Sequence, residues 1–324
     1  SMRKGEDQDE IPDVSWDFNI YMDGLLQTVN GKDRMTGSSI SFAAPTKAEN
    51  PWVSKKIHGE LKILGRTTTT LLKTDQESGL EGIFDQVQIL RSGESMPTLR
   101  EQSRPHEHRT NGAAESINHH VARHATLILS ELEDRVGTAI KRDRNFLLWL
   151  PEYSAMVKNR YDKKHGSTPY FNVHGKDCHE KCYEFCEKVM YRVHADPKKI
   201  DKLKPYHEEG IYLGMHPRGN VHIVYDPKLR IALTSSSLKT LPEERRWDRD
   251  AIENILATPW DWRAGLSDRE HMPHAKVRID PMSTETKTDT EPIRIMGEDH
   301  RQGTKKKQFY VTRRMINLFG TTDG

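Results

Sequence analysis

The sequence predicts an α/β core domain followed by a small all-β barrel. Strand and helix patterns alternate over about the first 165 residues, whereas short alternating strands dominate after residue 170. At 324 residues, the chain is long enough for about two domains. Its mean hydropathy is −0.81, and it has no apolar run of the roughly 18 residues that a membrane span requires, which excludes a membrane-spanning chain.

We predict four segments along the chain. Residues 1–13 form a flexible N-terminus, and residues 14–165 form the α/β core. Residues 166–250 form the barrel, and residues 251–324 form a basic, partly disordered C-terminal extension. The first 120 residues carry 14 basic and 18 acidic side chains, whereas the remainder carries 36 and 30. This division suits a metal site followed by a part that binds a polyanion.

Strand signals open the core. Residues 14–22 are rich in aromatic and β-branched side chains, which is typical of a strand. A turn signal at 33–37 precedes a further strand at 39–44, and the β-prone run 67–74 ends at Asp75. With the helices, the predicted order is three strands, a helix, a strand, a helix, a loop and a long helix. That order is typical of an α/β layer arrangement.

Helix signals occupy the rest of the core. Pro51 stands at a favoured first helical position, and apolar residues follow it at helical spacing until Gly65, which can end the helix. Residues 79–90 form a short helix, and residues 91–110 form a loop. A long helix follows Asn111–Gly112, and residues 146–161 form the last helix of the core.

The barrel region contains four short alternating stretches: 189–193, 210–214, 221–225 and 231–234. Turn signals at 217–220 and 226–229 lie between them. Such closely spaced short strands favour a small β-barrel. Trp247, Trp260 and Trp262 follow, and we expect them to pack a C-terminal extension onto the barrel.

Three carboxylates occupy informative positions. Asp17 lies inside the first strand between large hydrophobic residues, where a carboxylate is costly to bury unless it is paired or binds a cation. Asp75 stands at the end of a later strand, and Glu115 lies one turn into the long helix. Converging carboxylates would suit Mg²⁺, which prefers oxygen ligands. Asp23 and Asp33 are alternatives to Asp17, and three solvated carboxylates are the alternative to a site.

The segment Ser103–Asn118 resembles the signature around the catalytic glutamate in integrases of Copia-type LTR retrotransposons. The residues that fall where this signature expects them are Pro105, Asn111, Gly112, Ala114, Glu115 and Asn118. Leu71–Glu77 is similar to the strand that carries the second aspartate of the family. Val14–Phe18 is similar to the strand that carries the first.

The resemblance continues beyond the core and covers roughly residues 14–247. Lys202–Pro205, Gly210–Gly214 and Tyr225–Pro227 are similar to the SH3-like segment that follows Copia-type integrase cores. The resemblance therefore implies an RNase H-like, three-layer α/β core followed by a small SH3-like β-barrel. The N-terminal His/Cys zinc module of the family has no counterpart before Asp17.

The same resemblance implies a function. Asp17, Asp75 and Glu115 would be the catalytic residues and would bind two Mg²⁺ or Mn²⁺ ions. The enzyme would process the 3′ ends of element DNA and join them to target DNA. Element ends and target DNA would be its partners, and a homo-oligomer would hold the two ends. We expect a nuclear, reducing location and no membrane partner.

Two departures from the family pattern keep other hypotheses open. Gln76 stands where the family has Asn, and His106–Arg109 replaces aromatic and small residues. A chain of this kind can keep the fold and lose turnover. The second hypothesis is therefore a domesticated, catalytically inactive DNA- or chromatin-binding protein. A third is a nuclease of the same fold that hydrolyses DNA without joining it.

Basic side chains around the second helical region are candidates for DNA contact, because phosphate contacts supply most non-specific affinity for DNA. A solvated charged face is the alternative. By the resemblance, Asn111 would also shape the start of the helix that presents Glu115. The predicted DNA-binding residues are Asn111, Lys141, Arg142, Arg144, Lys158, Arg160, Lys163 and Lys164.

All three cysteines, Cys178, Cys182 and Cys186, lie in one stretch with a spacing of four. An odd number at this spacing indicates a reducing compartment rather than a disulfide framework. The spacing favours small buried residues on a helical turn. A zinc site that includes His174 and His179 is the alternative.

Three histidines follow Glu115 on the long helix: His119, His120 and His124. His119 lies one turn from Glu115 and is a candidate general base, with a surface or hydrogen-bonded role as the alternative. Near the C-terminus, Lys305–Lys307 is a candidate nuclear localisation element or DNA contact.

Overall fold

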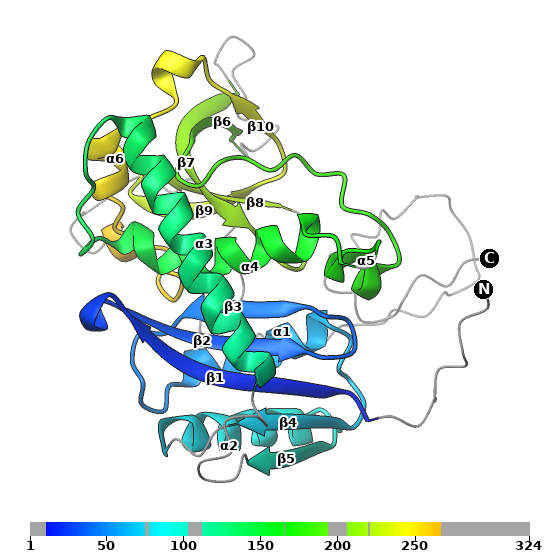
Figure 1. Ribbon diagram of the computed structural model, residues 1–324. Coiled ribbons are helices and arrows are strands. Elements are labelled where there is room, and N and C mark those ends of the chain that lie inside the picture. Colours follow the sequence, from blue (N-terminus) through cyan, green and yellow to red (C-terminus); the bar gives the residue numbers. More distant parts are fainter. Residues whose placement is uncertain are drawn as a thin grey trace, which may run out of the picture. The chain divides into compact units, whose positions relative to one another are not determined.

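A five-stranded mixed sheet forms the first part of the fold in the computed structural model, which describes residues 11–74, 78–102, 112–164, 166–193, 206–219 and 221–266 (Figure 1). The strand order is β3-β2-β1-β4-β5. The strands are β1 (Asp13–Tyr21), β2 (Leu26–Asp33), β3 (Ser39–Ala43), β4 (Thr70–Thr74) and β5 (Thr98–Gln102). β2 is antiparallel to β1 and β3, whereas β1, β4 and β5 run parallel. The predicted α/β class is confirmed.

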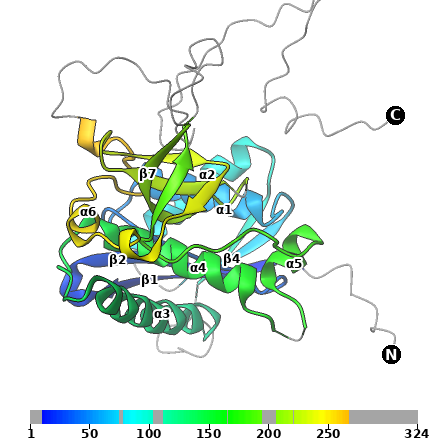
Figure 2. The ribbon, with the colours of Figure 1, turned by 90° about the horizontal axis from the view of Figure 1, so that it is seen from above.

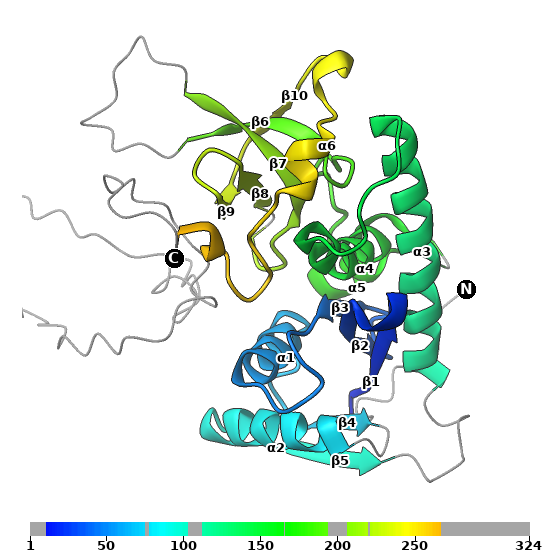
Figure 3. The ribbon, with the colours of Figure 1, turned by 90° about the vertical axis from the view of Figure 1, so that its left-hand side faces the viewer.

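Helices cover both faces of this sheet. α1 (Pro51–Ile63) and α2 (Ser78–Gly93) lie on one side, and α3 (Gly112–Val136) lies on the other (Figure 3). The expected start of α1 is confirmed. The Asn50 side chain accepts a hydrogen bond from the Trp52 amide at 2.9 Å, and Pro51 occupies the first turn. Gly65 follows the helix with φ of +73°, as expected for a residue that ends a helix.

The face of the sheet under α1 and α2 is apolar. Trp16 is fully buried there, and its ring lies 5.7 Å from that of Phe84 in α2. Gly31 on β2 is paired with Trp16, and a Cβ atom at Gly31 would lie 2.7 Å from the indole ring. The close approach of β2 to this ring therefore requires glycine at position 31.

The face under α3 is polar. Side chains alternate along a strand, so the neighbours of the apolar residues point the other way. The residues at these positions are Ser15, Asp17, Asn19, Thr28, Asn30, Lys32, Ser39 and Ser41. Thr28 and Asn30 are completely buried, and the three serines are nearly so. A polar layer thus separates β1, β2 and β3 from α3.

A second sheet of five antiparallel strands follows, in the order β10-β6-β7-β8-β9. The strands are β6 (Lys188–Arg192), β7 (His207–Met215), β8 (His222–Asp226), β9 (Ile231–Ser235) and β10 (Leu238–Thr240). The four strands predicted after residue 170 are confirmed, and β10 is an addition. The short helices η5 (Glu243–Arg245), α6 (Arg249–Glu253) and η6 (Ala264–Leu266) complete this region.

Three helical elements lie between α3 and the second sheet in the sequence. The 3₁₀ helix η3 (Asn145–Trp149) leads into α4 (Leu150–Tyr161), close to the predicted helix 146–161, and α5 (Pro169–His174) follows. α4 runs next to α3 (Figure 2). Asn159 of α4 donates to the Ser39 carbonyl at 2.6 Å and accepts from the Ser39 amide at 2.8 Å. This side chain covers the free edge of β3, which would otherwise expose unpaired backbone groups.

One hydrophobic cluster connects the second sheet to these helices. It combines Leu129 and Leu132 of α3 and Leu150 of α4 with residues of the second sheet, such as Tyr212 and Val224. A separate cluster lies between the first sheet, α1 and α2. Leu129 and Leu132, in the second half of α3, therefore pack against α4 and the second sheet. Asn118 lies on the same side of the helix in its first half and contacts the first sheet.

The loop predicted over 91–110 was wrong in part, because β5 lies within it. β5 is a short edge strand of mostly exposed polar residues, so its composition lacks a strand signal. The buried Arg91 guanidinium anchors the start of β5 by donating to Thr98 Oγ1 and to the Arg66 carbonyl, both at 2.7 Å. Burial lowers the pKa of Arg91.

One further expectation, for the cysteines, is corrected, and the one for the tryptophans is extended. The cysteines do not lie on a helix, since the segment between α5 and β6 has no helix; Cys186 is buried there, and all three are free. The tryptophans contact helices as well as the second sheet. The Trp260 ring lies 5.9 Å from Trp52 of α1, and Trp262 lies 5.8 Å from Trp149. The Trp262 carbonyl also accepts from Ala232 of β9.

The compact unit Ser1–Glu285 contains all the described residues. Among these residues, the structure has no helix with the length and hydrophobicity that a membrane span needs.

We expect Gly31→Ala to destabilise the protein by about 1–3 kcal/mol, because the added methyl group must displace the buried Trp16 ring. Urea unfolding measures the change. Gly93→Ala in α2 is the control, since a Cβ there meets open space and alanine favours a helix. Equal effects of the two substitutions would contradict the packing argument.

Candidate metal site between β1 and α3

Asp17 lies in a row of polar residues that crosses three strands. The strand register pairs Asp17 of β1 with Asn30 of β2, and Asn30 with Ser41 of β3. All three side chains therefore project from the same face of the sheet, the face that α3 covers. Asn30 and Ser41 are buried, whereas Asp17 is partly exposed. This row places one carboxylate at the boundary between the sheet and solvent.

Asn118 of α3 connects the helix to this row. Its Nδ2 donates to Oδ2 of Asp17, and its Oδ1 accepts from Nδ2 of Asn30 at 2.7 Å. The Tyr21 hydroxyl of β1 donates to the Asn118 carbonyl at 3.0 Å. Burial raises the pKa of Tyr21 to about 12, so this hydroxyl stays protonated at neutral pH. Three hydrogen bonds thus hold one turn of α3 against β1 and β2.

Glu115 and Asp75 are the other two predicted ligands. Glu115 lies in the first turn of α3, is exposed, and precedes Asn118 by three residues, so the two share one side of the helix. Asp75 lies outside the described residues. Its chain neighbour Thr74 ends β4 and pairs in parallel with Trp16, the residue before Asp17.

The two alternatives to Asp17 have other surroundings. Asp33 is fully buried and accepts two hydrogen bonds from Arg66, at 2.9 and 2.8 Å, as well as one from the Thr36 amide at 2.9 Å. This carboxylate ties the end of β2 to the segment after α1. Asp23 lies beyond β1, in the 3₁₀ turn η1 (Met22–Gly24), with φ of +54°. Neither aspartate belongs to the row that α3 covers.

The side-chain oxygen atoms in this region are of the type that coordinates a hard divalent cation. Asp17 and Glu115 offer carboxylate oxygens from a strand and a helix, and such oxygens are what Mg²⁺ prefers. Oδ1 of Asp17 accepts from the Phe18 amide at 2.8 Å, and Oδ2 accepts from Asn118. Each carboxylate oxygen can accept more than one partner. Within the described residues, which exclude Asp75, no group of three His, Cys, Asp or Glu side chains gathers as a metal site.

Sequence reasoning missed the residues that hold Asp17. In the sequence, Asn118 stands out only as part of the family signature, and no motif singles out Asn30 or Ser41. A signal for Asn118 was its spacing of three from Glu115, which places both on one helix face. A signal for Asn30 and Ser41 was the polar residue at every second position of strands that are otherwise apolar.

The three histidines of α3 differ in burial. His119 is exposed, whereas the rings of His120 and His124 stack with their centroids 5.3 Å apart. Burial lowers the pKa of His120 to about 4, with further lowering by Lys158 and His124, and it also lowers the pKa of His124. Buried ring nitrogens without a hydrogen-bond partner are Nε2 of His120 and Nδ1 of His124. Both rings are neutral at pH 7.

The predicted DNA-binding residues fall into two groups, with Asn111 outside the described residues. In the first group, each cation lies near a carboxylate: Lys141 near Glu253, Arg142 near Glu133 and Arg144 near Asp143. The second group surrounds the C-terminal end of α4, where Lys163 and Lys164 are exposed and Lys158 pairs with Asp162 at 3.2 Å. Burial lowers the pKa of nearby Lys32 to about 8, and Lys158 and Lys164 lower it further.

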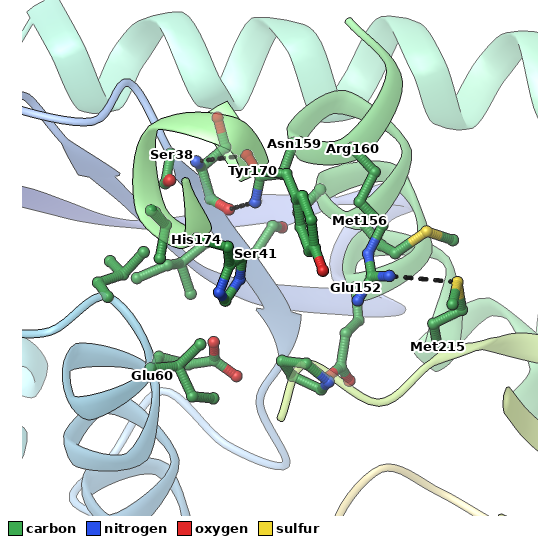
Figure 4. A pocket seen from close by; sticks show the side chains of 17 residues that line it. Ser38, Ser41, Glu60, Glu152, Met156, Asn159, Arg160, Tyr170, His174 and Met215 are labelled. Carbon is green, nitrogen blue, oxygen red and sulfur yellow. Dashed lines mark hydrogen bonds between the residues drawn. The ribbon is translucent and has the colours of Figure 1, made fainter. Parts of the chain in front are cut away.

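Arg160 is a buried member of this predicted set. Its guanidinium lies 5.2 Å from the Tyr170 ring centroid and donates to Sδ of Met215 at 3.5 Å. It lines a cavity of about 90 Å³ between α1, β3, α4 and α5, together with Glu60, Glu152 and His174 (Figure 4). Its position suits internal packing between α4 and the second sheet, whereas a surface contact with DNA phosphates needs an exposed side chain.

No family model matches the chain, and no curated protein matches it. Among solved structures, the chain is similar to the catalytic core domain of BIV integrase, at 11% identity over 50% of this chain and 92% of that chain, with a TM-score of 0.35. It is also similar to a chain of a simian T-cell lymphotropic virus intasome in complex with PP2A regulatory subunit B56 gamma. That match has 15% identity over 72% of this chain and 80% of that chain, with a TM-score of 0.39. The resemblance to Copia-type elements stays a prediction.

Asp33→Asn should cost about 3–5 kcal/mol of unfolding free energy, because it leaves the buried Arg66 guanidinium without its carboxylate. Asp85→Asn is the matched control: it breaks an exposed pair with Arg100 and should cost at most about 1 kcal/mol. Chemical denaturation of both variants tests the difference, and a similar small loss in each would argue against a structural role for Asp33.

Stability should fall as the pH drops from about 6.5 to about 4, in part because His120 must stay neutral in the folded protein. In the unfolded chain His120 takes up a proton near pH 6.5, whereas in the folded chain it does so only near pH 4. The free energy of unfolding therefore decreases as the pH falls through this range. His120→Gln should reduce the pH dependence, and His119→Gln at the neighbouring exposed position should not. The urea midpoint of each protein is measured at pH 5 and at pH 7.5. If the midpoint changes by the same amount between these pH values in all three proteins, the prediction is refuted.

Proposed function

We propose that the chain is an integrase-like polynucleotidyl transferase of the Copia-type retroelement class, acting on DNA with Mg²⁺ or Mn²⁺ bound by Asp17, Asp75 and Glu115. The observation that carries the proposal is the hydrogen bond from Asn118 of α3 to Asp17 of β1. It brings the helix turn that bears Glu115 against the strand that bears Asp17. Thr74, the residue before Asp75, pairs with Trp16, the residue before Asp17.

The arrangement of strands and helices supports an RNase H-like core. A sheet of order β3-β2-β1-β4-β5 with only β2 antiparallel, and helices on both faces, accommodates a carboxylate on the central strand β1. The second sheet supports an SH3-like barrel, because its last strand, β10, returns to pair with its first, β6. The strand order of the two sheets does not depend on the side chains of the candidate metal site.

The chemistry is a phosphoryl transfer between hydroxyl groups. When bound, the metal ions would activate the attacking hydroxyl and stabilise the leaving 3′ oxygen of the phosphodiester. One phosphorus–oxygen bond forms as another breaks, so joining needs no external energy source. Asp17, Asp75 and Glu115 hold the ions, and Asn118 orients the Asp17 carboxylate. Lys158, Lys163 and Lys164 contact phosphates of the bound DNA.

Two partners follow from this reaction. Element ends and target DNA are the substrates, and a homo-oligomer holds both ends for a concerted reaction in the nucleus. Positioning of these DNA segments supplies much of the rate, because the attacking and leaving oxygens must lie in line.

The test uses blunt oligonucleotide duplexes that carry presumed element ends, incubated with the protein and either Mn²⁺ or EDTA. We expect Mn²⁺-dependent nicking and joining that falls by at least about 100-fold in Asp75→Asn and Glu115→Gln, since each removes a charged ligand. Asp134→Asn, at an exposed position farther along α3, is the control and should retain activity.

Other products would select another function. DNA binding without any metal-dependent product, unchanged in both variants, would favour the inactive DNA- or chromatin-binding protein. Cleavage without joined products would favour a nuclease of the same fold.

A further inference from the structure

A relay of hydrogen bonds runs from the sheet interior to Asp17. Ser41 Oγ donates to Asn30 Oδ1 at 2.6 Å, Asn30 Nδ2 donates to Asn118 Oδ1 at 2.7 Å, and Asn118 Nδ2 donates to Asp17 Oδ2. Asn30 Nδ2 also donates to Thr28 Oγ1 at 2.9 Å. The relay therefore joins three strands to α3 through two side-chain amides.

The Asp17 carboxylate, at one end of the relay, determines which group donates and which accepts in every hydrogen bond of the relay. An ionised carboxylate only accepts hydrogen bonds, so Asn118 must turn its amino group toward Asp17. Its carbonyl oxygen then faces Asn30 and requires a donor, so Asn30 must present its amino group there. The carbonyl of Asn30 in turn accepts from Ser41. A rotated Asn118 amide would place its oxygen against the Asp17 carboxylate, and the two acceptors would repel.

The side chain of Asn30 is buried, so its hydrogen-bonding groups need partners inside the protein. Asn30 has no exposed surface; its carbonyl oxygen accepts from Ser41, and its amino group donates to Asn118 and to Thr28. A buried hydrogen bond contributes little net stability compared with an apolar side chain of the same shape. The adjacent positions of β2, Val29 and Gly31, serve the apolar face instead. Stability alone therefore does not account for an amide at position 30.

We propose that Asn30 is a positioning residue for the metal site: by holding Asn118 as a donor to Asp17, it keeps the Asp17 carboxylate turned toward a bound divalent cation. The inference rests on the proposed function, since it presumes that Asp17 binds the cation. Asn30 itself does not touch the cation or the DNA. It acts through Asn118, as residues behind metal ligands commonly do.

Direct binding of Mn²⁺ to the full chain, measured by calorimetry without DNA, tests this role. Asn30→Val should weaken binding by about 10-fold or more, the usual effect of losing a group that orients a metal ligand. Asp17→Asn identifies the binding that belongs to this site. Ser54→Ala is the matched control, because Ser54 is equally buried and hydrogen-bonded but lies in α1, away from Asp17. Unchanged affinity in Asn30→Val would overturn the proposal.

A double-mutant cycle separates positioning from a general structural effect. If Asn30 acts through Asn118, then Asn30→Val should change the Mn²⁺ affinity less than about twofold in an Asn118→Ala background. The same loss in both backgrounds would overturn the proposal. Ser41→Ala, which removes only the last donor of the relay, should weaken binding in the same direction and replaces Asn30→Val if that variant does not fold.

A second measurement keeps this inference distinct from the proposed function. If the wild-type chain binds no Mn²⁺, the proposed metal site fails, and the relay is judged by NMR of ¹⁵N-labelled asparagine side chains. The Asn118 amide signals are identified by their loss in Asn118→Ala. In Asn30→Val they should shift and exchange faster with water. Unchanged Asn118 signals would overturn the positioning role whatever the metal result.

Discussion

The alternation of side chains along β1, β2 and β3 gives the first sheet one apolar face and one polar face. One face of these strands buries Trp16 and its apolar neighbours beneath α1 and α2, and the other carries polar side chains beneath α3. A strand residue can serve only one face. Asp17, between Trp16 and Phe18, is therefore directed away from the apolar core by the same burial that holds its neighbours inside.

Two sets of contacts hold α3 in place. Asn118 and Tyr21 join it to the sheet by hydrogen bonds. Leu129 and Leu132 join it to α4 and the second sheet by apolar packing. The second sheet thus contributes to the candidate site without supplying a residue to it, because it supports the second half of the helix that carries Glu115.

Buried charges outside the site maintain the geometry of the first sheet. The pair of Asp33 and Arg66 closes the end of β2, and Arg91 holds the start of β5 through neutral oxygens. Lys56 of α1 lies between Glu60 and Glu152, which raise its pKa despite burial, and the contact with Glu152 is 2.5 Å. These contacts join elements distant in sequence, and none of them was visible as a motif.

Periodicity and turn residues act locally, and they were enough to predict the α/β class, the start and end of α1, the strands β1, β3 and β4, and four strands of the second sheet. They gave no range for β2. Packing between distant segments is what makes the polar stretch 98–102 pair as β5, keeps the cysteine segment from being helical, and buries Arg160. It also decided which neighbours hold Asp17, since Asn30, Ser41 and Asn118 meet only when β2, β3 and α3 pack together. Contacts between distant segments depend on strand register and helix packing, which a pattern of single residues does not encode.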